Sequence, residues 1–149
     1  MAFSVATVGP FGAMIEVEGV INDNWYTAMS ALILAECYRR NPSDEQMERL
    51  GVCACRTVSF ADVPKAIIMR RTEGLIKMAI HPQSGEIMGV HILAPHASEL
   101  IAEAMMLVRN KNTIDDVLES LPMFPTLSES IKMVAMAFTR DISKLSCCV

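Results

Sequence analysis

The cysteines are the residues of this chain whose type and spacing point most directly to chemistry. Two of the five, Cys147 and Cys148, are adjacent and lie at the end of the sequence. Thiolate sulfur prefers soft metal ions, whereas a disulfide between adjacent residues closes a strained ring. The pair is therefore a candidate binding site for a soft metal ion, on a mobile tail that comprises residues 145–149. Two incidental thiols at a frayed terminus are the alternative.

A second pair, Cys53 and Cys55, is separated by one residue in a stretch with a strand-like pattern. Side chains alternate between the two faces of a strand, so both sulfurs are expected on one face. Such a pair is a possible secondary site for a soft metal. Core packing is the interpretation that we favour, because a buried cysteine usually behaves as a small apolar residue.

The composition is that of a single globular domain with a surplus of apolar side chains. The 149 residues are 52% hydrophobic and 20% charged, with a formal net charge of −4. This length is sufficient to bury a core, and the scattered basic residues argue against a nucleic-acid partner. The high hydrophobic share, with 12 methionines, predicts a subunit interface.

The sequence has no sign of a membrane segment or an export signal. No run approaches the about 18 apolar residues that cross a bilayer, and residues 1–4 lack the basic start of a signal peptide. We therefore expect a cytoplasmic protein with reduced thiols and no membrane partner.

Local patterns predict an α+β fold, in which a central antiparallel sheet has helices packed on one face. Alternating or β-branched runs predict strands over residues 5–8, 13–21 and 52–60, a further extended piece over 66–69, and a hairpin over 74–80 and 86–93. Helical spacing and capping residues predict helices over residues 25–40, 43–50 and 97–109, one opening at Thr113 with Asp116 as its capping acid, and one opening at 126–129.

The segments Gly-Leu-Ile-Lys, Gly-Glu-Ile-Met-Gly-Val-His, Ala-Pro-His-Ala-Ser-Glu-Leu-Ile and Phe-Pro-Thr-Leu-Ser-Glu follow one another over residues 74–129. In this order they resemble the C-terminal dimerisation domain of pyridine nucleotide-disulfide oxidoreductases. The segment Ala-Phe-Thr-Arg-Asp-Ile-Ser-Lys-Leu-Ser-Cys-Cys is similar to the mercuric reductase branch. The resemblance covers residues 51–149, and residues 5–9 resemble the family's first strand. Residues 10–42 interrupt the pattern, so we expect one domain over 1–149 with an insertion there.

The resemblance implies a homodimer that pairs through its sheet and helices. It also implies that Cys147 and Cys148 accept Hg(II) from solution thiols and pass it to the active site of the partner subunit. FAD and NADPH are implied only in domains that this sequence does not contain, so no catalytic residue is expected here. The alternatives are a stand-alone dimerisation module and a small thiol metal-binding protein, which would also use Cys53 and Cys55.

One position departs from the wider family. In relatives that reduce disulfides, the resemblance implies a histidine at the position of Phe124, which acts as acid and base and pairs with the acid at Glu129. Phenylalanine cannot carry a proton. The loss favours the mercuric reductase branch, whose members also lack this histidine, and leaves Glu129 as an acid at a helix start.

Overall fold

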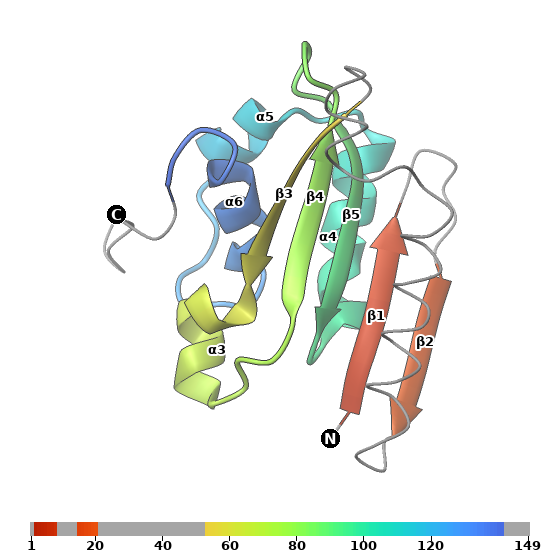
Figure 1. Cartoon of the computed structure of the whole chain (residues 1–149), viewed down its shortest axis with the longest axis vertical. Coiled ribbons are helices and arrows are strands. Elements are labelled where there is room, and N and C mark those ends of the chain that lie inside the picture. Colours follow the sequence, from red (N-terminus) through yellow and green to blue (C-terminus); the bar gives the residue numbers. More distant parts are fainter. Residues whose placement is uncertain (1, 9–14, 21–52, 142–149) are drawn as a thin grey trace.

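The computed structural model describes residues 2–8, 15–20 and 53–141 (Figure 1). In this part of the chain, five strands form one antiparallel sheet in the order β2-β1-β5-β4-β3. The strands are β1 (Ala2–Val8), β2 (Ile15–Val20), β3 (Ala54–Ser59), β4 (Leu75–Ile80) and β5 (Ile87–Ala94). The helices are η1 (Phe60–Asp62), α3 (Pro64–Met69), α4 (Ala97–Arg109), α5 (Ile114–Glu119) and α6 (Glu129–Met136).

The predicted hairpin is confirmed as β4 and β5. His81 donates its backbone N–H to the carbonyl of Glu86 at 2.9 Å, and Gly85 donates to the carbonyl of His81 at 2.9 Å. Gly85 has φ +70°, a conformation that glycine adopts without the steric penalty of a Cβ atom. This short connection holds the two central strands antiparallel, with Ile76 opposite Ile92.

The buried core lies between one face of the sheet and two helices. Ile76, Met78, Val90 and Ile92 are at most 1% exposed, and their register places them on the same face. α4 packs against β1 and β5, whereas α6 packs against β3 and β4, so both lie behind the sheet in Figure 1. Each fully buried aliphatic side chain contributes about 1.5–3 kcal/mol relative to exposure. The α+β prediction, with helices packed on one face, is confirmed.

The prediction of an extended piece over residues 66–69 is wrong, because these residues form most of α3. The two β-branched residues Ile67 and Ile68 suggested a strand, but Pro64 occupies the first turn of the helix, where its missing N–H breaks no hydrogen bond. Arg70 ends the helix in a left-handed conformation, φ 54°, and its N–H reaches the carbonyls of Ala66 and Ile67. Local capping therefore outweighs a weak strand propensity.

The remaining helix starts agree with the sequence where the structure describes them. Thr113 and Asp116 form the predicted reciprocal capping box: the Thr113 side chain accepts from the Asp116 N–H at 3.3 Å, and the Asp116 carboxylate accepts from the Thr113 N–H at 2.7 Å. The last helix begins at Glu129 after Ser128, whose side chain makes no capping hydrogen bond. The helices predicted over 25–40 and 43–50 lie outside the described residues.

The backbone at Gly74, where the chain enters β4, has no room for a side chain. Gly74 has φ +116°, and a Cβ atom there would lie 1.9 Å from the carbonyl oxygen of Leu93. We expect Gly74→Ala to lower the free energy of unfolding by about 3 kcal/mol, through backbone strain and displacement of β5. Urea denaturation followed by circular dichroism measures this change.

Gly85→Ala is the matched control. Gly85 also has a positive φ, but the atom nearest to an added Cβ there is the Ile114 Cγ1 atom, at 3.5 Å. We therefore expect only the conformational penalty of about 1 kcal/mol. Equal losses for the two variants would contradict the close approach of Gly74 to β5.

Candidate functional site

The structure places the residues that lead to the predicted cysteine tail. Cys147 and Cys148 themselves lie outside the described residues, which extend to Asp141. After α6 the backbone turns, and the N–H groups of Thr139 and Arg140 both donate to the carbonyl of Met136, at 2.9 and 2.8 Å. The last described turn is therefore a continuation of α6.

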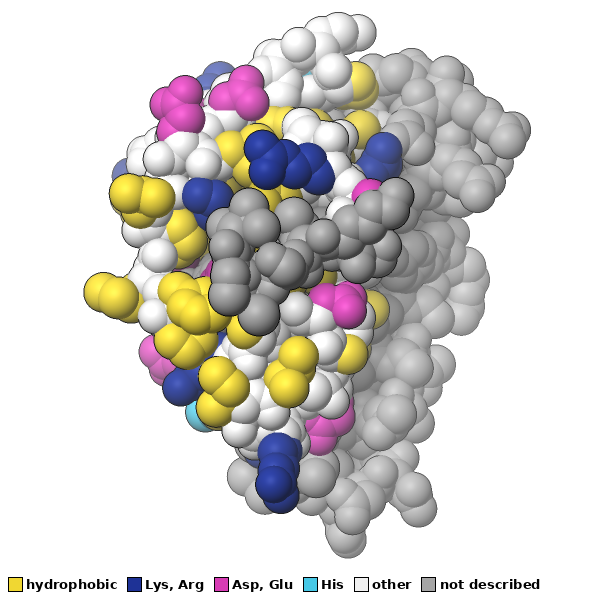
Figure 2. All heavy atoms as spheres, turned by 90° about the vertical axis from the view of Figure 1, so that its left-hand side faces the viewer, with side chains coloured by type: hydrophobic (Ala, Val, Ile, Leu, Met, Phe, Trp, Pro, Cys, Tyr) yellow, Lys and Arg dark blue, Asp and Glu magenta, His cyan; other side chains and the backbone are white. Residues whose placement is uncertain are grey.

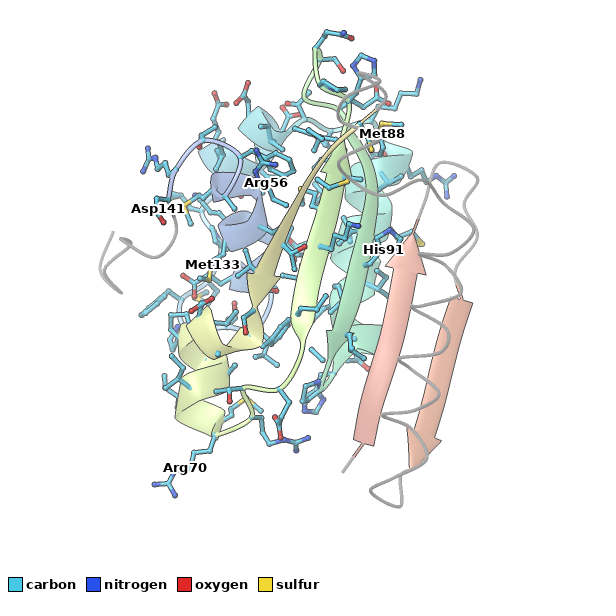
Figure 3. The ribbon with its side chains drawn as sticks, viewed as in Figure 1. Arg56, Arg70, Met88, His91, Met133 and Asp141 are labelled. Carbon is cyan, nitrogen blue, oxygen red and sulfur yellow. The ribbon has the colours of Figure 1, made fainter. Side chains whose placement is uncertain are left out.

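This turn is attached to the edge of the sheet by an aromatic contact. The guanidinium carbon of Arg56 lies 5.4 Å from the ring centroid of Phe138, within the range of a cation–π interaction. Arg56 belongs to β3, and Figure 3 shows it beside α6. At a partly exposed site, such a contact stabilises by about 0.5–1 kcal/mol. The last described turn of the chain therefore lies beside β3.

The segment between α5 and α6 carries Phe124, the position at which the resemblance predicts a histidine in disulfide-reducing relatives. Its ends are held by the ammonium of Lys132, which donates to the carbonyl of Ser120, and by the hydroxyl of Thr126, which donates to the carbonyl of Met123 at 2.8 Å. Phe124 lies within this segment and is 55% exposed. An aromatic ring that faces outward is able to contact another molecule, but it has no proton to transfer.

Glu129 begins α6. Its Oε2 atom is buried and has no hydrogen-bond partner among the described residues. Burial raises the pKa of this carboxyl above its usual value, because taking a carboxylate out of water disfavours its charged form.

Large hydrophobic side chains are exposed on α3 and on the segment before α6. Figure 2 shows hydrophobic side chains gathered on the face that lies at the left in Figure 1. We use the name hydrophobic surface for the exposed residues Ile67, Ile68, Met69, Leu121, Met123 and Phe124. Exposed groups of this kind mark contacts with other molecules. Sequence reasoning singled out Phe124 but missed the other residues, although Pro64 and the run of apolar residues after it were a signal for a short exposed helix.

Cys53 and Cys55 are brought together. Their Sγ atoms lie 3.7 Å apart, so the expectation that both face one side of the strand is confirmed. Cys53 is buried, at 8% exposed, and Cys55 is half-buried. Both thiols are free of disulfides. Within the described residues, no group of three or more Cys, His, Asp or Glu side chains could hold a metal ion. These two thiols would therefore supply two ligands.

Residues 43–135 match the family model of the pyridine nucleotide-disulphide oxidoreductase dimerisation domain. The match covers more than half of the chain, and the chain belongs to this family. Within the described residues, no helix is long and apolar enough to span a membrane.

Inside this family, the similarity is to mercuric reductases. The chain is 39% identical over 93 residues to the mercuric reductase of Serratia marcescens, a match over 62% of this chain and 20% of that protein. It is 32% identical over 107 residues to the mercuric reductase of Streptomyces lividans, a match over 71% of this chain and 23% of that protein. The chain thus corresponds to about a fifth of these relatives.

Solved structures agree on the fold. LpdA from Mycobacterium tuberculosis is 26% identical and superimposes with a TM-score of 0.56 over 64% of this chain and 21% of that chain. The HOCl-induced flavoprotein disulfide reductase RclA from Escherichia coli is 19% identical, with a TM-score of 0.56 over 63% of this chain and 22% of that chain. This second likeness shows the fold alone.

The raised pKa of Glu129 predicts that the stability of the protein depends on pH. The folded-state pKa of Glu129 is raised, so its stabilising contribution is present below the unfolded pKa, when the group is protonated in both states, and is lost as the pH rises through the folded pKa. We expect Glu129→Gln to stabilise the protein more, relative to wild type, at pH 7 than at pH 4. Urea denaturation of both proteins at the two pH values measures this difference.

Asp116→Asn provides a control of opposite sign. Hydrogen bonds from the Thr113 backbone and then its side chain lower the pKa of Asp116, so its stabilising contribution is present above the unfolded pKa and is lost as the pH falls through the folded pKa. This variant should be destabilised at pH 7 and approach wild type in acid. The same pH trend for both variants would contradict the assignment of Glu129 as a carboxyl destabilised by burial.

Proposed function

We propose that this chain is the dimerisation and Hg(II)-delivery domain of a mercury(II) reductase. The observation that carries the proposal is the adjacent pair Cys147 and Cys148, which follows a scaffold of the dimerisation-domain family and of mercuric reductase-like sequence. In this proposal the chain forms a homodimer, and each cysteine pair serves the active site of the partner subunit.

Delivery would proceed by thiol exchange. Hg(II) arrives bound to two small thiolates, and the sulfurs of Cys147 and Cys148 displace them one after the other. Two mercury–sulfur bonds form, two break, and the protons of the cysteine thiols leave with the released small thiols. Because one thiolate holds the ion while the other exchanges, the ion is never free in solution. A second exchange of the same kind would pass it to an active-site thiol pair.

The described structure supports this role by the way it positions the start of the tail. The turn after α6 is hydrogen-bonded to Met136, and the contact of Phe138 with Arg56 fixes it to β3. Eight residues, 142–149, follow the last described one, and a chain of that length reaches at most about 29 Å.

Reduction itself would need groups that this chain does not hold. In such an enzyme NADPH and FAD supply the two electrons that convert Hg(II) to Hg(0). The sequence contains no G-x-G-x-x-G segment, the type of loop that binds dinucleotide phosphates, so we expect both groups in other domains. The role of this chain is therefore pairing and delivery, within a reducing compartment such as a cytoplasm. Its biological outcome would be mercury resistance.

The first prediction of this proposal concerns the tail. In a background with Cys37→Ser, Cys53→Ala and Cys55→Ser, only Cys147 and Cys148 remain. We expect this variant to retain one Hg(II) per chain in excess small monothiol, because two linked thiolates bind the ion more tightly than separate ones. Adding Cys147→Ser and Cys148→Ser should abolish retention, measured as mercury content after gel filtration. Equal mercury content in the two variants would remove the delivery role.

The second prediction concerns the interface. If the hydrophobic surface pairs two subunits, Leu121→Glu with Met123→Glu should raise the dimer dissociation constant at least tenfold, because charges would be buried without partners. Both side chains are strongly exposed, at 96% and 77%, so the fold should be retained. Sedimentation equilibrium measures the association.

Met106→Glu is the matched control for this experiment. It also places a charge at an exposed hydrophobic position, 48% exposed, but on α4. We expect it to leave the dimer intact. A monomeric wild-type protein would refute dimerisation altogether, and a dimer that is equally weakened by all of these changes would refute the assignment of the surface.

A further inference from the structure

The pair Cys53 and Cys55 has the geometry of a metal chelate. A metal ion bonded to both sulfurs at about 2.3 Å, the length of a Zn–S bond, fits their separation of 3.7 Å with a sulfur–metal–sulfur angle of about 107°. This angle is close to the tetrahedral one, so the pair fits a thiophilic ion that also binds further ligands. Hg(II) held by two sulfurs alone is linear, so at this spacing it would carry a further thiol as well.

A disulfide fits this position less well. Two residues separated by one in an extended chain have Cα atoms about 6.6 Å apart, which is near the upper limit of about 6.8 Å for disulfides. A disulfide would need the two Sγ atoms to approach from 3.7 Å to about 2.05 Å, whereas a metal ion bonds both sulfurs at their present separation.

Cys53 and Cys55 differ in burial. Cys53 is 8% exposed, whereas Cys55 is half-buried, so Cys55 is the more exposed residue of the pair. β3 is an edge strand of the described sheet, so the pair lies at an edge of the sheet and not at its centre.

Cys55 shares its face of the sheet with basic residues. Cys55 pairs with Ala79 and Thr57 pairs with Lys77, so Cys55 and Lys77 lie on the same face, at a diagonal step in the sheet. His91 lies opposite Lys77 on β5.

We propose that Cys53 and Cys55 bind one soft, thiophilic metal ion. They form a second thiol metal-binding site, separate from the tail. Hg(II) carried by two small thiolates would exchange onto the pair: two metal–sulfur bonds form, two break, and the cysteine protons leave with the released thiols. Only two protein sulfurs hold the ion among the described residues, so its other positions stay open to a further thiol. This site therefore binds the ion and releases it again to a thiol. It rests on the proposed function only for the identity of the ion as mercury.

The test uses the full chain with Cys37→Ser, Cys147→Ser and Cys148→Ser, so that Cys53 and Cys55 are the cysteines that remain. The probe is Hg(II) supplied with a tenfold excess of a small monothiol. We expect one Hg(II) per chain after gel filtration, with the ultraviolet absorption of a mercury–thiolate complex. The bound ion should also protect both cysteines from alkylation, measured by mass spectrometry.

Adding Cys55→Ser to this background should lower the affinity for Hg(II) at least 100-fold, because the remaining thiol binds as an ordinary monothiol. Cys55 is half-buried, so this variant should fold, and circular dichroism checks that it does. A chain that keeps Cys37 as its one cysteine is the matched control with a single thiol.

Mercury retention equal to that of the single-thiol control, or unprotected alkylation of Cys53 and Cys55, would overturn this proposal. Neither result would affect the delivery role, which is tested in the variant that keeps only Cys147 and Cys148. If the variant that keeps only Cys147 and Cys148 retained no mercury while Cys53 and Cys55 did, delivery by the tail would be refuted. The site at Cys53 and Cys55 would still be supported.

Discussion

The antiparallel register of β4 and β5 is the constraint on which the described structure depends. It places Ile76 opposite Ile92 and Met78 opposite Val90, and these side chains form the layer beneath α4 and α6. Because side chains alternate along a strand, a slip by one residue would turn this layer away from the helices. The close approach of Gly74 to the Leu93 carbonyl holds the same register from the backbone side.

The positions of Cys53 and Cys55, and of the described residues that precede the tail, depend on this register. β3 pairs with β4, which sets Cys55 on the face opposite the helix layer, and α6 packs over β3 and β4. The contact between Arg56 and Phe138 then connects the edge strand that carries one cysteine pair with the turn that leads to the other. The elements that carry or precede the two cysteine pairs are therefore neighbours, although the pairs are far apart in the sequence.

Much of this architecture follows from local sequence patterns. The hairpin, the capping box of Thr113 and Asp116, and the common face of Cys53 and Cys55 were all predicted, because each depends on residues close together in the chain. α3 was not, since Ile67 and Ile68 favour strands when considered alone. The exposure of Leu121 and Met123 depends on how distant elements pack, so no local pattern indicated it.

The central claim is that a self-pairing scaffold presents a mercury-binding tail, and native mass spectrometry tests it most directly. The full chain and a variant lacking residues 146–149 would each be loaded with Hg(II) in excess monothiol. The account predicts dimers in both cases, with one Hg(II) fewer per chain in the shortened protein. A monomeric full chain, or the same mercury content in both proteins, would contradict it.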